Sequence, residues 1–231
     1  WIVTGTESYS DQTIVLNGNL VIENGGNLTF RRVTFEMNCT YDGQYRIEVM
    51  FGGKFYVLDD SLITAVDHEK EFLFDVHVGS TFRMNSSELH ECGIEDGGNG
   101  LYISSTDVVI ENSLISNNRY AIICDYCNPV IRNNNISSNE FEAISLNHSN
   151  GTIEANHIED NGAGIRGDFY SSPVIQGNTV VKNGISIHFY NYCNPIIQGN
   201  NISQNGWPGI IIAGFCSPII QNNTITANGN G

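Results

Sequence analysis

Short apolar runs alternate with polar turn residues along the whole chain, and one spacing recurs. Four segments share one form: NPVIRNNNISSN from Asn128, SPVIQGNTVVKN from Ser172, NPIIQGNNISQN from Asn194 and SPIIQNNTITAN from Ser217. Two more copies lack the proline, VIENSLISN from Val109 and IEANHIEDN from Ile153. Each copy holds short β-branched stretches separated by Asn, Gly, Ser and Pro, which are turn residues. The pattern predicts short strands, because no window repeats at about 3.6 residues as a helix would.

The repeats have a nearly constant period. An apolar anchor falls at Val109, Ile131, Ile153, Ile175, Ile197 and Ile220, in steps of 22 residues with a last step of 23. Three longer repeats upstream align on Phe30, Val57 and Met84. Units of this size with three short strands each predict an all-β, right-handed parallel β-helix. We expect one domain, 1–231, of about nine coils of 22–27 residues, with longer, looped coils in 1–108 and regular coils in 109–231.

Two columns of asparagine follow from this period, because equivalent residues of successive coils lie about 4.8 Å apart. We expect their amides to bond the coils above and below and to have a structural role. One ladder comprises Asn112, Asn134, Asn156, Asn178, Asn200 and Asn223, and the other Asn117, Asn139, Asn161, Asn183, Asn205 and Asn228. Ser87 and Cys92 stand at the corresponding places one coil earlier.

Period-two alternation after the second ladder separates inward from outward residues. It predicts the outward pairs Ile122/Cys124, Ile144/Leu146, Arg166/Asp168, His188/Tyr190 and Ile211/Ala213, so that two polar coils lie between apolar ones. The polar pairs would form a rectangle of about 5 Å by 7 Å. Rings at Tyr126, His148, Tyr170, Tyr192 and Phe215 flank it. We predict a ligand-binding surface of Arg166, Asp168, Tyr170, His188, Tyr190 and Tyr192, because stacked tyrosines suit the faces of a pyranose.

A catalytic alternative uses the same rectangle, with Arg166, Asp168, His188 and Tyr190 as its residues. An arginine that holds a carboxylate and a His or Tyr that exchanges a proton would suit a uronate lyase or epimerase. Hydrolysis fits less well, because Asp168 is the only acid in the rectangle. An exposed sheet stabilised by an Arg–Asp pair and stacked rings explains the same residues. We favour that explanation and assign no catalytic residue.

These repeats resemble the right-handed parallel β-helix superfamily of pectin-degrading enzymes and related carbohydrate-binding surface proteins. The Asn-x-Ile-x-x-Asn units are similar to those of archaeal cell-surface proteins and of the family that includes the periplasmic copper-binding protein of nitrous-oxide reductase maturation. The resemblance implies the fold over nearly the whole chain and says little of activity, because such repeats encode coils. No Asp-Pro-His-Asp segment typical of alginate epimerases occurs.

Three functions remain open. The first, which we favour, is a non-catalytic module with a structural, adhesive or glycan-binding role. We expect it outside the cell or on the cell surface, or in the periplasm as the equivalent compartment. The second is the polysaccharide lyase or epimerase. The third is copper delivery, which three Met and six His scattered along the chain support weakly. The expected partner is a polysaccharide or cell-surface glycan, and the expected cofactor is none, with Ca²⁺ left open.

Composition narrows the partners further. A net charge of −15 argues against nucleic acid, because phosphate binding needs clustered Lys and Arg. No apolar run reaches the roughly 18 residues that a membrane span needs. Glycosylation sequons of an extracellular glycoprotein occur at Asn27, Asn38, Asn85, Asn135, Asn147, Asn150, Asn201 and Asn222.

The cysteines and one charged loop offer further candidates. Cys193 and Cys216 occupy the same place in adjacent coils once the Gly206–Gly209 insertion is counted, which makes them a disulfide candidate. Cys127 lies in the same column three coils away, and Cys39 and Cys92 are two coils apart, so none of these should pair. The Cys124-Asp-Tyr-Cys127 segment and the loop with Asp67, His68, Glu69 and Glu71 are weak metal signals, and we predict no metal site.

The carboxyl end completes a repeat at Ile225 and continues to Gly231 without a capping helix or polar lid. The end of a β-helix exposes unpaired strand edges. We therefore expect end-to-end stacking, either with a second copy or with flanking sequence. Because the chain begins at Trp1 without a leader, we expect a mature protein or an excised domain.

Overall fold

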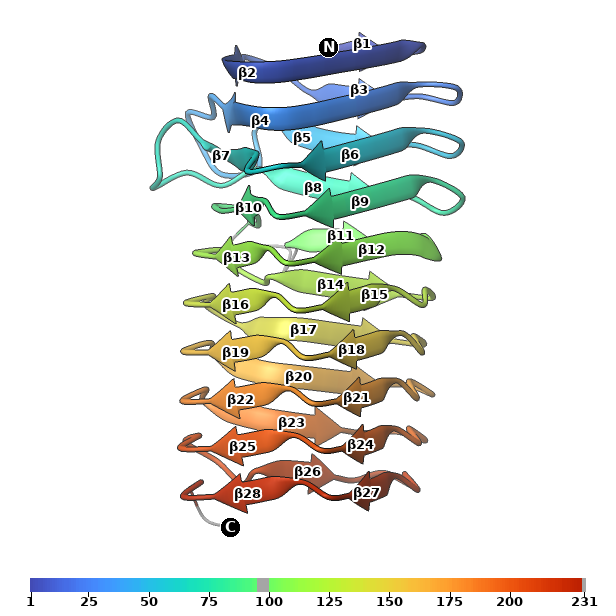
Figure 1. Cartoon of the computed structure of the whole chain (residues 1–231), viewed down its shortest axis with the longest axis vertical. Coiled ribbons are helices and arrows are strands. Elements are labelled where there is room, and N and C mark those ends of the chain that lie inside the picture. The colour runs from blue at the N-terminus through green and yellow to red at the C-terminus, as the bar shows by residue number, and fades with distance from the viewer. Residues whose placement is uncertain (95–99, 230–231) are drawn as a thin grey trace.

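The computed structural model describes residues 1–94 and 100–229, which wind into a stack of parallel coils (Figure 1). Over these ranges the backbone consists of strands, turns and bends, without a helix. One sheet has ten strands and takes one strand from each coil, and the other has eighteen. The parallel β-helix predicted from the repeat is confirmed, with ten coils in place of nine. The added coil is the first, in which Tyr9 pairs with Phe30.

The strands of the ten-stranded sheet follow one another down the stack. They are β1 (Ile2–Val3), β3 (Leu20–Ile22), β5 (Arg46–Val49), β8 (Leu73–Val76), β11 (Leu101–Ile103), β14 (Ile122–Asp125), β17 (Glu142–Asn147), β20 (Ala163–Asp168), β23 (Ile185–Phe189) and β26 (Ile210–Ile212).

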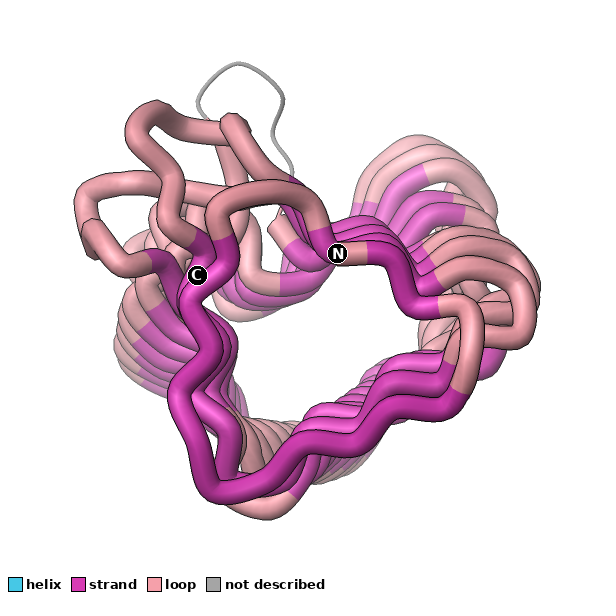
Figure 2. The backbone as a smooth tube through the Cα atoms, turned by 90° about the horizontal axis from the view of Figure 1, so that it is seen from above, coloured by secondary structure: helices cyan, strands magenta, loops and turns pink. Residues whose placement is uncertain are grey.

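The eighteen-stranded sheet is bent into two halves, which gives the coil its three-sided outline (Figure 2). The long strands β2 (Thr6–Leu16) and β4 (Asn27–Met37) run through both halves. The first half continues with β6 (Lys54–Leu58), β9 (Thr81–Asn85), β12 (Asp107–Glu111), β15 (Val130–Arg132), β18 (Thr152–Glu154), β21 (Val174–Gln176), β24 (Ile196–Gln198) and β27 (Ile219–Gln221). The second half continues with β7 (Leu62–Ala65), β10 (Glu88–Leu89), β13 (Leu114–Ser116), β16 (Asn135–Ser137), β19 (His157–Glu159), β22 (Thr179–Val181), β25 (Asn201–Ser203) and β28 (Thr224–Thr226).

In the coils from Asn134 onward, the two bends at the asparagine ladders combine a residue at positive φ with an inward asparagine. In one coil Ala155 has φ 52°, and the next residue, Asn156, is buried. The Asn156 Nδ2 donates to the Ile131 carbonyl and to Asn178 Oδ1, and its backbone N–H donates to the same oxygen. These bonds satisfy backbone carbonyls and amides that the bend takes out of the sheet. The asparagines therefore fix both the bend and the register between coils.

The upper end of each ladder lies one residue away from its predicted place. Ser113 and Asn118 are the ladder members, and Asn112 and Asn117 sit at positive φ in the bends. The cause is a coil of 21 residues, because Ile110, and not Val109, pairs with Ile131. The predicted places of Ser87 and Cys92 are right, since their backbone amides donate to Ser113 Oγ and Asn118 Oδ1. The other predicted ladder asparagines form the ladders.

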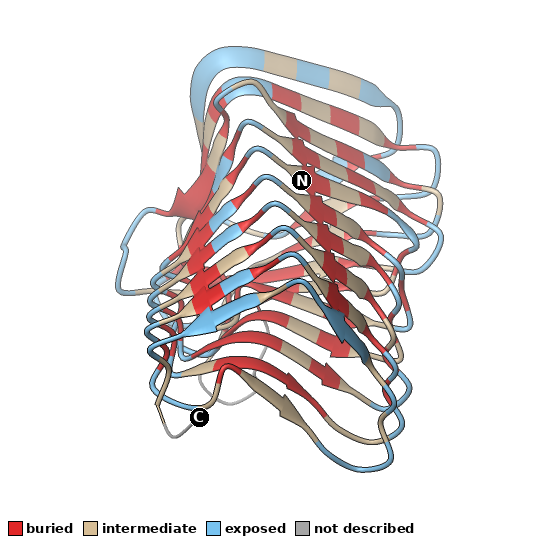
Figure 3. Cartoon of the chain, turned by 60° about the horizontal axis from the view of Figure 1, so that its bottom comes forward, coloured by how far each residue is buried: buried red, intermediate tan, exposed pale blue. Residues whose placement is uncertain are grey.

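The core is a column of apolar side chains that changes character along the stack. Aromatic rings fill the first coils, and those of Phe30, Phe55, Phe74 and Phe82 contact one another with centroids 5.3 to 6.1 Å apart. Isoleucine dominates the later coils. In the last coil Ile220 and Ile225, which continue buried columns, are exposed (Figure 3). The stack thus presents apolar side chains at this end.

Candidate functional site

The outward side chains of β20, of β23 and of the residue after β23 form the polar strip, defined here as Arg166, Asp168, His188 and Tyr190. Arg166 pairs with His188 in the register of the two strands, and their inward neighbours Gly167 and Phe189 pair beside them. Each of the four residues of the predicted rectangle lies on the outer face, and Ile211 and Ala213 continue that face below. The strip lies on the face of the ten-stranded sheet that points away from the core.

The coils above the strip have a different register from the predicted one. Ile122, Cys124, Ile144 and Leu146 are buried in the core. Their neighbours Ile123, Asp125, Ser145 and Asn147 are the outward residues, because Ser145 pairs with Arg166 and Asn147 with Asp168. The face therefore stays polar for one further coil, and the coil above it presents Ile123 and Asp125. The period-two pattern gave the wrong inward residues in these two strands, because each strand has consecutive apolar residues and either of two neighbours could point into the core.

Arg166 is held by two carboxylates. Its guanidinium lies 3.3 Å from Glu142 Oε1 and 3.5 Å from Asp168 Oδ2. Glu142 approaches diagonally from β17, and the alternation pattern gave no sign of it. Asp168 is therefore not the only acid beside Arg166. Because both partners are negative, Arg166 has its charge balanced within the protein. This arrangement makes Arg166 a poor anchor for the carboxylate of a uronate.

Carboxylates and amides next to Arg166 form a fixed hydrogen-bond network. Asp168 Oδ1 accepts from Asn191 Nδ2 at 2.7 Å and from the backbone of Phe169 at 2.9 Å. One coil above Asn147, Asp125 accepts from the Tyr102 hydroxyl and from Asn147 Nδ2, both at 2.7 Å. Burial and this carboxylate raise the pKa of Tyr102 above its usual value. The network holds a row of acceptor oxygens in place without a ligand.

His188 is the most buried titratable group of the strip, with 4% of its surface exposed. Burial, with Arg166 adding to it, lowers the pKa of His188 to about 4, so the imidazole is neutral at pH 7. Its Nδ1 has no hydrogen-bond partner among the described residues. A neutral buried imidazole next to an arginine is able to accept a proton.

Unpartnered polar atoms gather on this side of the molecule. Of the six buried side-chain N and O atoms without a partner in the described structure, three lie here, namely Asn147 Oδ1, His148 Nδ1 and His188 Nδ1. Buried polar atoms in proteins are nearly always hydrogen-bonded, so such a concentration marks a place where outside groups would be bound favourably.

Five rings beside the strip form the aromatic column, defined as Tyr126, His148, Tyr170, Tyr192 and Phe215. Tyr126 and His148 are 4.3 Å apart and nearly parallel. Tyr170 stacks on Tyr192 at 5.3 Å and Tyr192 on Phe215 at 5.4 Å. This stacking covers part of each ring, and Tyr170 and Tyr192 remain 59% and 47% exposed. That they contact a sugar stays a prediction. The column presents partly exposed rings and hydroxyl groups, and Phe215 is 83% exposed at its end.

Every ring of the column stands on a backbone at positive φ, from 48° at His148 to 66° at Tyr192. Bulky side chains rarely adopt this conformation, which costs on the order of 1 kcal/mol per residue. The same turn after the ten-stranded sheet uses Gly25, Gly52 and Gly79 at positive φ in earlier coils. Glycine has no such penalty. Positive φ also occurs in the other bends of the coils, for example at Ala155 and Lys182, so this turn is set apart by the large ring that stands there in five successive coils.

Away from the polar strip, a cleft lies on the outer face of the eighteen-stranded sheet, under the loop with Asp67 and Glu69. It is lined by Leu62, Thr64, His68, His90, Glu91 and Asn117. The buried Glu91 carboxylate accepts from the Thr64 hydroxyl and lies 3.3 Å from His68 Nδ1. His90 contacts Glu88 at 3.0 Å and Ser116 Oγ at 2.9 Å. The sequence pointed only to the loop, because the other lining residues come from different coils that are distant from the loop along the chain.

Among the remaining sequence candidates, Cys124 and Cys127 are both buried and their thiols lie within hydrogen-bond distance of each other. Cys39 and Cys92 are buried elsewhere. All six cysteines are free thiols. Among the sequons, Asn135, Asn150, Asn201 and Asn222 are exposed, and the other four are half-buried. Within residues 1–94 and 100–229, no three His, Cys, Asp or Glu side chains are placed to hold a metal ion. The described part of the chain also contains no helix that is long and apolar enough to cross a membrane.

Comparison with known families identifies the repeat. Residues 99–231, more than half of the chain, match the family model of the right handed beta helix region. This range includes the polar strip and the aromatic column. No curated protein matches the sequence significantly.

Proposed function

Because the chain belongs to the family of right-handed β-helix regions, whose repeats fix coils rather than chemistry, we propose that it is a non-catalytic extracellular module that binds a glycan. The glycan lies along the stack, across the polar strip and against the aromatic column. The observation that carries this proposal is the column of five rings from successive coils, four of them exposed, beside the polar strip. Exposed aromatic side chains that gather in one place are typical of a binding surface.

The chemistry of the face suits an uncharged or weakly charged sugar. Ring edges supply apolar contact for C–H groups, and the carboxylates of Asp125 and Asp168 accept from sugar hydroxyls. The unpartnered atoms of Asn147 and His188 offer further bonds. Neighbouring coils repeat these groups about every 4.8 Å, which suits an extended polymer better than a single small molecule. The exposed sequons agree with display outside the cell.

A glycan array probed with the full chain tests this proposal. We expect the double variant Tyr170→Asn, Tyr192→Asn to bind its glycan at least about tenfold more weakly, a loss of about 1.4 kcal/mol. Asparagine is chosen because it tolerates positive φ, so that the turn keeps its conformation. Tyr41→Asn, at an exposed tyrosine outside this face, is the matched control and should bind as the unaltered protein does. Unchanged affinity in the double variant, or no bound glycan for the unaltered protein, would overturn the proposal.

A second candidate function is proton transfer on the bound polysaccharide, as in a lyase or epimerase. The specific observation in its favour is His188, neutral at pH 7 with an unpartnered Nδ1. An enzyme of this kind should form unsaturated or epimerised uronate and lose turnover in His188→Gln while still binding. A binding module should show no turnover before or after the substitution.

A further inference from the structure

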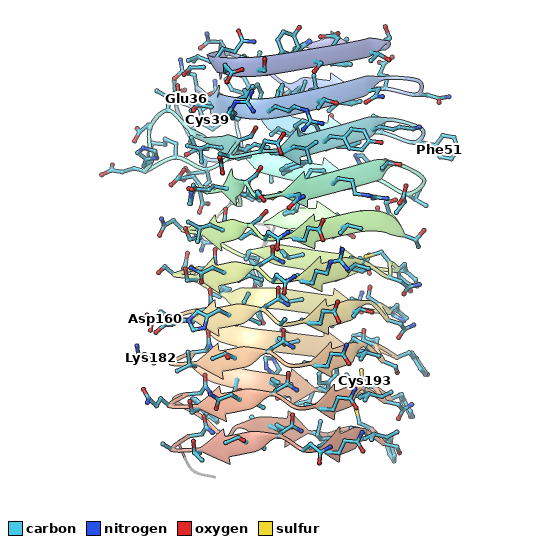
Figure 4. The ribbon with its side chains drawn as sticks, viewed as in Figure 1. Glu36, Cys39, Phe51, Asp160, Lys182 and Cys193 are labelled. Carbon is cyan, nitrogen blue, oxygen red and sulfur yellow. The ribbon has the colours of Figure 1, made fainter. Side chains whose placement is uncertain are left out.

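The third corner of the coil, next to the aromatic column, contains a ladder of small polar residues. We call Cys127, Ser149, Ser171, Cys193 and Cys216 the serine–cysteine ladder. The backbone N–H of Cys127 donates to Ser149 Oγ at 3.2 Å, and that of Ser149 to Ser171 Oγ at 3.1 Å. The backbone N–H of Cys193 likewise donates to Cys216 Sγ at 3.2 Å. Figure 4 shows Cys193 at this edge of the stack. The thiols thus occupy the places of hydroxyls.

Hydrogen bonding alone does not require sulfur at these places. Ser149 and Ser171 donate to carbonyls two and three residues earlier at 2.8 and 2.7 Å. Cys193 and Cys216 donate to the carbonyls of Tyr190 and Ala213, each three residues earlier, at 2.8 and 3.0 Å. Serine therefore performs the structural task in the two coils directly above. Cysteine packs as a small apolar side chain, as Cys193 does in the core, and two cysteines in adjacent coils can in addition bond covalently to each other, which serine cannot.

We propose that Cys193 and Cys216 form a redox-dependent disulfide that joins two successive coils beside Tyr192 and Phe215. Successive ladder positions lie about 5 Å apart, within the Cα separation that a disulfide spans. Cys127 has serine as its ladder neighbour in the next coil. The inference does not depend on glycan binding.

The reaction needs an oxidant that bears a disulfide, such as oxidised glutathione. Burial raises the pKa of the Cys193 thiol to about 11, which disfavours its thiolate, whereas Cys216 is partly exposed. The Cys216 thiolate therefore attacks first, forming a mixed disulfide and releasing one glutathione thiolate. Cys193 then loses its proton and attacks the Cys216 sulfur, releasing the second glutathione. Two protein thiols are oxidised, one oxidised glutathione is reduced to two glutathione thiols, and the two protons of the protein thiols pass through the solvent to the released glutathione thiolates.

Digestion with trypsin can locate the bond. No Lys or Arg follows Lys182, so residues 183–231 remain one peptide that contains both cysteines. Cys124 and Cys127 fall together in residues 120–132, Cys39 in 33–46 and Cys92 in 84–119. After incubation of the full chain with oxidised glutathione and alkylation, we expect peptide 183–231 to be unlabelled and two hydrogens lighter. Two alkyl labels on this peptide, or a stable glutathione adduct on Cys216, would overturn the proposal.

Stability supplies a second readout. The loop closed by the bond has about 23 residues, for which the melting temperature should rise by about 5 to 10 °C on oxidation. The double variant Cys193→Ser, Cys216→Ser should fold, because serine fills the same ladder positions above, and should show no such rise. Cys39→Ser is the matched control, because Cys39 is a buried cysteine in a distant coil, and this variant should respond to oxidation as the unaltered protein does. An equal rise in the double variant would contradict the assignment.

Discussion

At the scale of single residues, the lowered pKa of His188 should make the free energy of unfolding depend on pH. Its pKa of about 4 in the folded protein lies below the value of about 6.5 expected in the unfolded chain. As pH falls from about 6.5 towards 4, the unfolded chain takes up a proton that the folded protein does not, so stability present at neutral pH is lost. We expect this residue alone to lower the free energy of unfolding by about 2 kcal/mol between pH 7 and pH 5.

Urea denaturation at the two pH values measures this effect. In His188→Gln the difference between pH 7 and pH 5 should shrink by about 2 kcal/mol, because the titrating group is gone. His157 is the matched control, since it is an exposed histidine of β19 bonded to Glu159. His157→Gln should retain the His188 contribution. An unaltered pH dependence in His188→Gln would show that burial does not depress its protonation.

At the scale of elements, β20 and β23 fit each other through a small and a large residue. A side chain at Gly167 would meet the ring of Phe189, its partner in the next strand, and Phe189 is fully buried. Gly167→Ala should therefore lower the free energy of unfolding by about 1 to 3 kcal/mol, the usual cost of overpacking. Adding Phe189→Leu makes room and should recover part of that loss. Additive effects in this double-mutant cycle, measured by urea denaturation, would rule out the contact.

The individual strands and ladders also show which features of the fold the sequence predicts and which it does not. The Asn ladders and the strands that follow Asn134 were predictable, because β-branched and asparagine positions recur with little ambiguity. The register of β14 was not, since Ala121, Ile122 and Ile123 are all apolar and leave the inward phase undetermined. The Glu142–Arg166 ion pair depends on a diagonal reach between coils. The ring stacking depends on side-chain rotation at the turn. Neither appears in a one-dimensional pattern.

At the scale of the whole molecule, charge should select among glycans. The net charge is −15, and two carboxylates already balance Arg166. A polyuronate is therefore repelled at long range, and salt screens that repulsion over a Debye length of about 10 Å at 0.1 M. We expect affinity for a polyuronate to rise several-fold between about 0.05 and 0.3 M NaCl, and affinity for a neutral polysaccharide to stay constant. Calorimetric titration of both polymers tests this, and weaker polyuronate binding at high salt would contradict it.

The two asparagine ladders give the molecule an electrical direction. From Asn134 to Asn223 and from Asn118 to Asn228, each Nδ2 donates to the Oδ1 of the following coil, without reversal. The side-chain amide dipoles are therefore aligned head to tail along the axis, as peptide dipoles are in a helix. Their negative oxygen ends point to the first coils and their positive N–H ends to the last coils. Each bond polarises the next one. A single aspartate in a ladder would still accept from the preceding coil but could not donate to the following one, so the alignment would be interrupted at that place.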